Sequence, residues 1–267
     1  MVELYEKCMK IYSDYRVVVP PYAAAALSFY LLLILIPACS MVAIATSFLN
    51  IDMTVIENLI SQYIMGEYAT MIIDVLESRT IGTMAMLTMI FSFYAVSRGV
   101  GNIYEISKNM YPESKEESIL SYYIYTFKIT FILLVLFVGI IAVIAIGPLA
   151  YLFNILYPLF GIRHIILYFM IAFCLMSIYL IVPRVRVRYR DAFQGAMIAA
   201  ALMLVLYYCL NIYFQFADFQ SVYGPLASII VILFVFDWAA EIFYIGLYVT
   251  HILHERRIED EKRESRN

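Results

Sequence analysis

The residues best placed to do chemistry are two acids inside a long apolar segment near the carboxyl end of the chain. Asp237 and Glu241 are four residues apart, so a helix places both carboxylates on one face. Their flanks are apolar, VILFVF before Asp237 and IFYIGLYV after Glu241. Ionised carboxylates are costly in hydrocarbon, so acids there face a partner, water or a bundle interior. The pattern indicates either a proton- or cation-binding site in a transport pathway or a structural ion pair that fixes helix register.

A basic residue elsewhere in the chain is predicted to lie at a matching depth. Counted from Pro225 along a helix, Asp237 lies about 18 Å and Glu241 about 24 Å into its segment. Arg98, in FSFYAVSRGVGNIYE, lies about 26 Å from the outer end of its own predicted segment. We therefore predict an Arg98–Glu241 ion pair that keeps Glu241 charged and leaves Asp237 as the protonatable group. Asn211 completes the set of polar side chains expected to line a pathway.

Patterns for catalysis and metal binding are missing from the sequence. The four cysteines form no CxxC motif or Cys/His cluster, so neither a structural zinc nor a disulfide framework is indicated. His251 and His254 lie near one end of the last apolar segment and His164 on the other side of the membrane, so the histidines form no metal set. There is no GxSxG, P-loop or HxxxH motif with a nearby acid. We expect no enzyme activity, no catalytic residues, no cofactor and no metal.

The composition determines which elements position these residues. Hydrophobic residues make up 64% of the 267 residues and charged residues 15%. A soluble domain is about half apolar and about a quarter charged. The chain therefore lacks the polar surface of a water-soluble domain, and we predict an all-α polytopic membrane helix bundle in contact with lipid.

The apolar segments predict six transmembrane helices, since a bilayer core needs about 20 mostly apolar residues per helix. They are residues 22–48, 81–104, 121–146, 164–182, 192–216 and 225–251. Six spans place sixteen of the 18 Lys and Arg residues on one side, as expected for cytoplasmic loops. We predict a plasma-membrane protein with both termini cytoplasmic, a membrane domain over residues 1–254 and a charged cytoplasmic tail over 255–267.

Residues 52–78 are long enough for a further span, but their pattern is amphipathic. Apolar side chains recur at helical spacing, and the polar positions between them are acidic or amide and include no lysine. A membrane-surface helix usually has a basic polar face. We predict an external helical hairpin, broken near Gly66, between the first two spans; the alternative is an ordinary interfacial cap.

Four arginines alternate with other residues in PRVRVRYR, between the fourth and fifth spans. They are Arg184, Arg186, Arg188 and Arg190. The run is either the topology signal itself or a binding patch for anionic lipid headgroups. A nucleic-acid surface is not indicated, because no basic module surrounds the run and the tail carries five charges of each sign.

Runs of small residues open the first and fifth spans, around Ala23–Ala26 and from Gly195 to Ala201. Small side chains let helices approach closely in membranes. The runs predict tight helix packing, with a sliding contact between spans as the alternative.

The order of four motifs resembles the YihY/BrkB family of bacterial and archaeal membrane proteins. The matching stretches are YAAAALSFYLLLILIP, AVSRGVGNIYE, RYRDAFQGAMIAA and SVYGPLASIIVILFVFDW. The resemblance covers nearly the whole chain and implies an integral membrane protein with about six spans. It carries no established biochemical activity: an older ribonuclease label is generally regarded as mistaken, BrkB itself is associated with serum resistance, and a transport role has been suggested.

Single residues match the family pattern unevenly. Arg98 and Gly99 match its SRG element, and Tyr223 with Gly224 matches its YG element. GLYVT stands where the family has a GAELN-like pattern, and Asp237 stands where the family has apolar or tryptophan-leucine residues. The resemblance therefore supports Arg98 more than Asp237 as a family-wide functional residue.

Two functions from different classes follow from the sequence. The first is a transporter or permease for an ion, a small solute or a lipid, with a polar pathway lined by Arg98, Asp237, Glu241 and Asn211. The second is a non-transporting membrane scaffold or envelope assembly factor in which these charges form a structural ion pair. The expected partners are the lipid bilayer and anionic lipids, with no nucleic acid, and the sequence leaves the substrate and the oligomeric state open.

Overall fold

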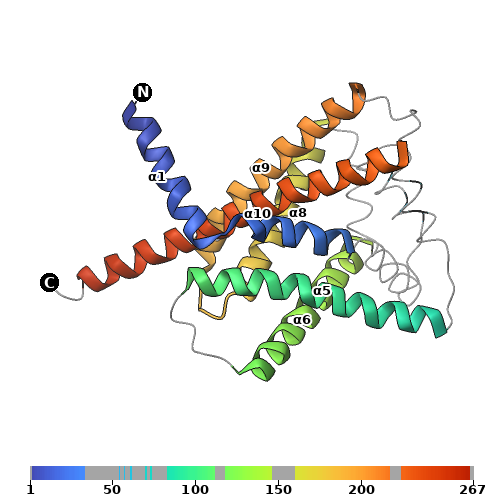
Figure 1. Cartoon of the computed structure of the whole chain (residues 1–267), viewed down its shortest axis with the longest axis horizontal. Coiled ribbons are helices and arrows are strands. Elements are labelled where there is room, and N and C mark those ends of the chain that lie inside the picture. Colours follow the sequence, from blue (N-terminus) through green and yellow to red (C-terminus); the bar gives the residue numbers. More distant parts are fainter. Residues whose placement is uncertain are drawn as a thin grey trace. The chain divides into compact units, whose positions relative to one another are not determined.

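The described part of the chain consists of helices joined by short non-helical segments. The computed structural model describes residues 2–33, 83–111, 118–145, 160–216 and 224–264, with residues 54, 57, 61, 70 and 73 between them. The labelled helices are α1 (Val2–Val18), α5 (Thr83–Met110), α6 (Ile119–Ala145), α8 (Phe160–Ile181), α9 (Tyr189–Phe216) and α10 (Gly224–Glu264) (Figure 1). A further helix, Pro21–Leu33, follows α1. The predicted all-α class is confirmed for these residues.

Several of these helices are long and apolar enough to cross a membrane. Among the described residues, three qualify alone: Ile119–Leu136, Tyr189–Tyr213 and Ile230–Glu264. A fourth span results if the bent pair Met9–Val18 and Pro21–Leu33 crosses as one, and Ile165–Ile181 is a shorter apolar helix. The chain is therefore a membrane protein with several apolar helices. The predicted count of six spans stays a prediction, and the predicted hairpin over residues 52–78 lies outside the described residues apart from isolated positions.

A proline pair separates α1 from the helix that follows it. Val19 donates its backbone N–H to the Tyr15 carbonyl at 2.8 Å, which ends the first helix. Pro20 has no N–H to continue the ladder, and Pro21 occupies the first turn of the next helix, where proline is tolerated. The two helices meet at a bend of 60°. The end of α1, just before this bend, contacts α10 through Tyr15 and Arg16.

Helices α9 and α10 pack side by side at a contact made of glycine and alanine (Figure 1). A Cβ atom on Gly195 would lie 2.5 Å from the Gly246 carbonyl oxygen and would collide with the Thr250 hydroxyl. A Cβ atom on Gly246 would lie 2.6 Å from the Ala199 Cβ and would collide with the Tyr179 hydroxyl. The small-residue run at the start of α9 therefore packs tightly, as predicted. Beside this contact, Tyr179 of α8 donates its hydroxyl to the Phe243 carbonyl of α10 at 2.8 Å.

The chain divides into two compact units. The first contains residues 1–32, 99–122 and 164–267, and the second contains residues 33–98 and 123–163. Every contact described below lies within the first unit.

Candidate functional site

Glu241 is held by two residues from the end of α1. The Arg16 guanidinium reaches both carboxylate oxygens, with Nη2 2.9 Å from Oε1 and Nη1 3.4 Å from Oε2. The Tyr15 hydroxyl donates to Oε1 at 3.0 Å. Arg16 is itself positioned by Tyr12, whose hydroxyl accepts from Nε at 3.0 Å. The side chains of Arg16 and Glu241 are 25% and 23% exposed, so most of the ion pair is buried within the protein.

Asp237 lies one helical turn from this pair and is half-buried. Its carboxylate makes no hydrogen bond or ion pair to any residue that the structure describes. The two acids therefore differ in their contacts. Glu241 has a positively charged partner, whereas Asp237 has none among those residues. A carboxylate at this position in an apolar helix needs a proton, a cation or water as its partner.

A second polar contact next to Glu241 joins α10 to two other helices. The Asn102 amide of α5 donates to the Tyr244 hydroxyl at 3.0 Å and to the Ala23 carbonyl at 3.2 Å. Tyr244 and Ala23 are fully buried. These bonds hold the helix turn that carries Glu241 against α5 and the Pro21–Leu33 helix, which limits how far the carboxylate can move.

The other residues predicted to line a pathway are not tested by these contacts. Arg98 belongs to the second compact unit, so its pairing with Glu241 stays a prediction. The cation that pairs with Glu241 among the described residues of the first unit is Arg16, which was not predicted as its partner. Asn211 is half-buried on α9, and its place in a pathway also stays a prediction.

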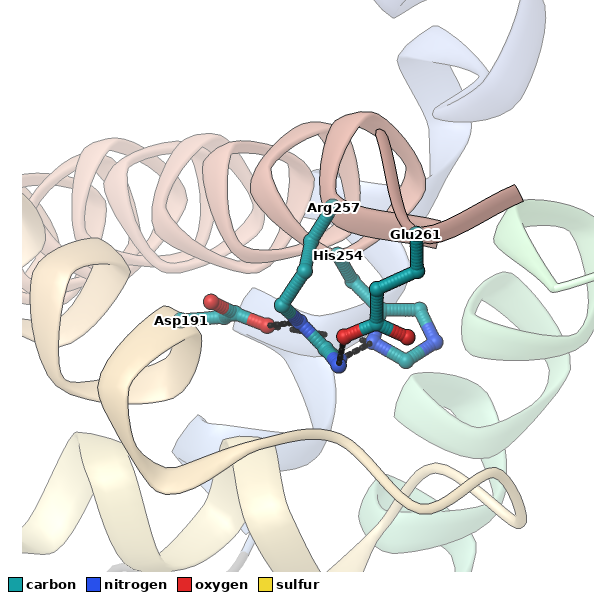
Figure 2. A network of polar contacts seen from close by, with 4 residues as sticks. All are labelled: Asp191, His254, Arg257 and Glu261. Carbon is teal, nitrogen blue, oxygen red and sulfur yellow. Dashed lines mark hydrogen bonds and ion pairs between the residues drawn. The ribbon is translucent and has the colours of Figure 1, made fainter. Parts of the chain in front are cut away.

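A network of charges ties the start of α9 to the last part of α10 (Figure 2). Arg257 Nε donates to Asp191 Oδ2 at 3.1 Å, and Arg257 Nη1 donates to Glu261 Oε1 at 3.2 Å. Arg257 Nη2 lies 2.9 Å from His254 Nδ1. Because a guanidinium can only donate, His254 Nδ1 accepts here and this histidine is neutral, with its hydrogen on Nε2. Asp191 also lies in the first turn of α9, where the helix dipole favours a negative charge.

Two buried polar atoms beside this network have no partner among the described residues. They are the Tyr111 hydroxyl and His251 Nδ1, and the two rings meet edge to face with centroids 5.0 Å apart. Burial, followed by the negative charges of Asp191 and Glu255, raises the pKa of Tyr111 above its ordinary value. Buried polar groups without partners are rare in proteins and call for a water, an ion or a ligand.

Two pockets lie beside the residues that carry these atoms. A pocket of about 170 Å³ is lined by Tyr111, His254, Glu255 and Lys262 among others. A pocket of about 470 Å³ is lined by Asp14, Asn109, Tyr248, His251 and Glu255 among others. Within the described part of the chain, no group of three or more His, Cys, Asp or Glu side chains could hold a metal ion.

The arginine run forms an exposed strap between α8 and α9. Arg184, Arg186, Arg188 and Arg190 are all exposed. Val182 and Val187 are buried, at 0% and 8% exposure. The strap therefore presents its arginines to the surroundings and Val182 and Val187 to the protein; binding of lipid headgroups stays a prediction.

Four residues that take part in these contacts were not predicted from the sequence: Tyr15, Arg16, Asp191 and Arg257. In the sequence, Arg16 stands out only as one of the basic residues expected on the cytoplasmic side. A usable signal was the Tyr12, Tyr15 and Arg16 spacing, which places two tyrosines and the arginine on one side of a helix that ends at a proline pair.

Comparison with known proteins supports one assignment. The family model described as virulence factor BrkB matches residues 18–267. Searches of the curated proteins and of the solved structures gave no match. The family match includes both acids of α10, the Arg257 network and the arginine strap, but not Tyr15 and Arg16. Because the match covers nearly the whole sequence, the chain belongs to the BrkB family of membrane proteins.

Proposed function

We propose that this protein is a transporter or permease for an ion, a small solute or a lipid, and that Asp237 exchanges a proton or cation during transport. It is not an enzyme in this proposal, and it resides in the plasma membrane with both termini in the cytoplasm. The observation that carries the proposal is the difference between the two acids of α10: Glu241 is fixed by Arg16 and Tyr15, whereas Asp237 has no protein partner among the described residues.

A structural role explains this arrangement less well. An ion pair that only fixed helix register would need one acid, and Glu241 already supplies it. A second carboxylate one turn away adds a desolvation cost without a compensating contact. Intramembrane acids of this kind commonly bind protons or ions in transport proteins. Arg98 and Asn211 are proposed to line the same pathway.

The arginine strap has a supporting role in this proposal. Its four exposed arginines would lie at the cytoplasmic surface and bind anionic lipid headgroups, each contributing about 1 kcal/mol near a charged membrane. This contact would hold the start of α9, and with it the Asp191–Arg257 network, at a fixed depth.

The test is reconstitution into liposomes that contain pH-sensitive and ion-sensitive dyes. Wild-type protein is compared with Asp237→Asn and Glu241→Gln, and with Glu259→Gln as a matched control at an exposed acid of the same helix. We expect the wild type and the control to carry a flux that Asp237→Asn reduces at least about tenfold, equivalent to about 1.4 kcal/mol. Equal leak in all four preparations would contradict transport and favour the scaffold function.

A further inference from the structure

We propose that α1 lies in the interfacial layer of the bilayer, with one side in contact with lipid, and that it does not cross the membrane. The helix is about 25 Å long and ends at the proline pair that precedes the apolar helix Pro21–Leu33. Among its described side chains from Glu6 to Val18, only Tyr15 is buried. Most of these side chains are therefore exposed, and what surrounds them must suit both sides of the helix.

One side of α1 exposes large apolar and aromatic side chains. Met9, Ile11 and Tyr12 are 49%, 60% and 53% exposed. They lie on the same side as Tyr15, since residues three and four apart are neighbours on a helix surface. A row of this kind is unfavourable in water and is typical of a surface that contacts a partner or a membrane.

The opposite side of α1 is charged. Glu6, Lys10 and Asp14 follow one another at helical spacing, and all of them are exposed. Exposed charges are expensive in hydrocarbon, so this side disfavours a crossing of the bilayer by α1. The charges have both signs, so burial of the apolar side, rather than attraction to anionic lipid, holds the helix at the membrane.

The contacts between α1 and α10 show how these two sides are oriented. Tyr15 and Arg16 reach Glu241, within the apolar part of α10. Asp14, on the charged side, lines a pocket together with Glu255, where the charged end of α10 begins. Helix α1 therefore passes over α10 where apolar residues give way to charged ones, with its charged side towards the charged end. Since the apolar part of α10 belongs in lipid and its charged end in water, the apolar side of α1 is turned towards the membrane.

The bend at the proline pair suits this position. A transmembrane helix tilts by about 20° from the bilayer normal on average. If Pro21–Leu33 enters the membrane with such a tilt, an α1 bent 60° from it can lie within about 10° of the membrane plane. Tyr12 and Tyr22 are exposed on either side of the bend, and tyrosine is enriched at the headgroup level of membrane proteins.

The test measures quenching of tryptophan fluorescence in the full-length protein, reconstituted in phosphatidylcholine vesicles. Trp238 is the only tryptophan of the chain, so Trp238→Phe gives a background without signal. In this background, Met9→Trp reports on the apolar side of α1, and Lys10→Trp is the matched control on the charged side. We expect lipid brominated near the headgroup end of its acyl chains to quench Met9→Trp at least about twofold more than Lys10→Trp, because an interfacial helix buries its apolar side by about 5–10 Å. Acrylamide, a quencher dissolved in the water, should give the reverse order.

Three results would overturn the proposal. Equal quenching of Met9→Trp and Lys10→Trp by acrylamide would place both sides of α1 in water. Protection of Met9→Trp from both quenchers would mean that protein, such as a second copy of the chain, covers the apolar side. Stronger quenching of Met9→Trp by lipid brominated near the ends of its acyl chains would mean that α1 crosses the membrane.

Two features of the design keep the outcome clear. If Trp238→Phe does not fold, as its thermal unfolding midpoint reports, the two α1 variants in the wild-type chain give the same comparison by difference, because Trp238 contributes equally to both. The measurement does not involve Asp237 or any flux, so failure of the proposed transport function would leave this inference standing.

Discussion

The pairing of Glu241 with Arg16 predicts a large, measurable coupling between two residues 225 positions apart. Replacing Arg16 with methionine keeps most of its length and removes its charge. Loss of one partner from a fully buried ion pair costs about 3–5 kcal/mol, whereas an exposed pair contributes about 0–1 kcal/mol. Both side chains here are about one quarter exposed, and the Tyr15 hydroxyl continues to donate to Glu241. We therefore expect Arg16→Met to destabilise the protein by about 2 kcal/mol.

The assay is a double-mutant cycle on the free energy of unfolding, measured by denaturant titration in detergent micelles. The cycle combines Arg16→Met with Glu241→Gln, and we expect the double variant to be more stable than the two single losses added together, with a coupling of about 1.5 kcal/mol. Lys10→Met, an exposed charge on the same helix, is the control. Strict additivity, or a larger coupling of Glu241 to Arg98 than to Arg16, would refute the assignment of Arg16 as the partner.

Three further predictions concern packing and buried polar groups. Gly246→Val should lower the thermal unfolding midpoint by an amount equivalent to about 1–3 kcal/mol, because a Cβ there already lies 2.6 Å from the Ala199 Cβ; Ala201→Val, at an exposed position of α9, should change it little. Asp191→Asn should lower the free energy of unfolding by about 1–2 kcal/mol by weakening the charged hydrogen bond from Arg257, and an unchanged denaturation curve would argue against the network. Tyr111→Phe should leave the protein as stable or raise its free energy of unfolding by about 1 kcal/mol, since the hydroxyl is buried without a described partner; a clear loss in the same titration would show that the hydroxyl is satisfied.

Much of the helical structure could be predicted because few backbone structures are stable in lipid. A backbone in hydrocarbon must satisfy its own hydrogen bonds, so long apolar segments become helices. The predicted segments starting at residues 121, 164, 192 and 225 correspond to α6, α8, α9 and α10, which begin at Ile119, Phe160, Tyr189 and Gly224. Each of these helices begins one to four residues before the predicted start, while α6, α8 and α9 end within one residue of the predicted ends.

The site was only partly predictable because its partners come from distant parts of the sequence. Asp237 and Glu241 could be identified as candidate site residues because they are acids within an apolar segment. Their surroundings did not, since α1 is too polar to be recognised as part of the bundle, and depth alone could not choose between Arg16 and Arg98. The Asp191–Arg257 contact needed the crossing of α9 and α10, which is set by Gly195 and Gly246 rather than by any charge pattern.

For proton-coupled transport, the proposed function requires that the Asp237 carboxyl gain and lose a proton while Glu241 keeps its ion pair with Arg16. Infrared difference spectroscopy of the reconstituted protein across a pH step measures this directly through the carbonyl stretch of a protonated carboxyl group. We predict a band that is present in the wild type and in Glu241→Gln and is lost in Asp237→Asn. A wild-type spectrum without the band, or a band that persists in Asp237→Asn and disappears in Glu241→Gln, would contradict the account.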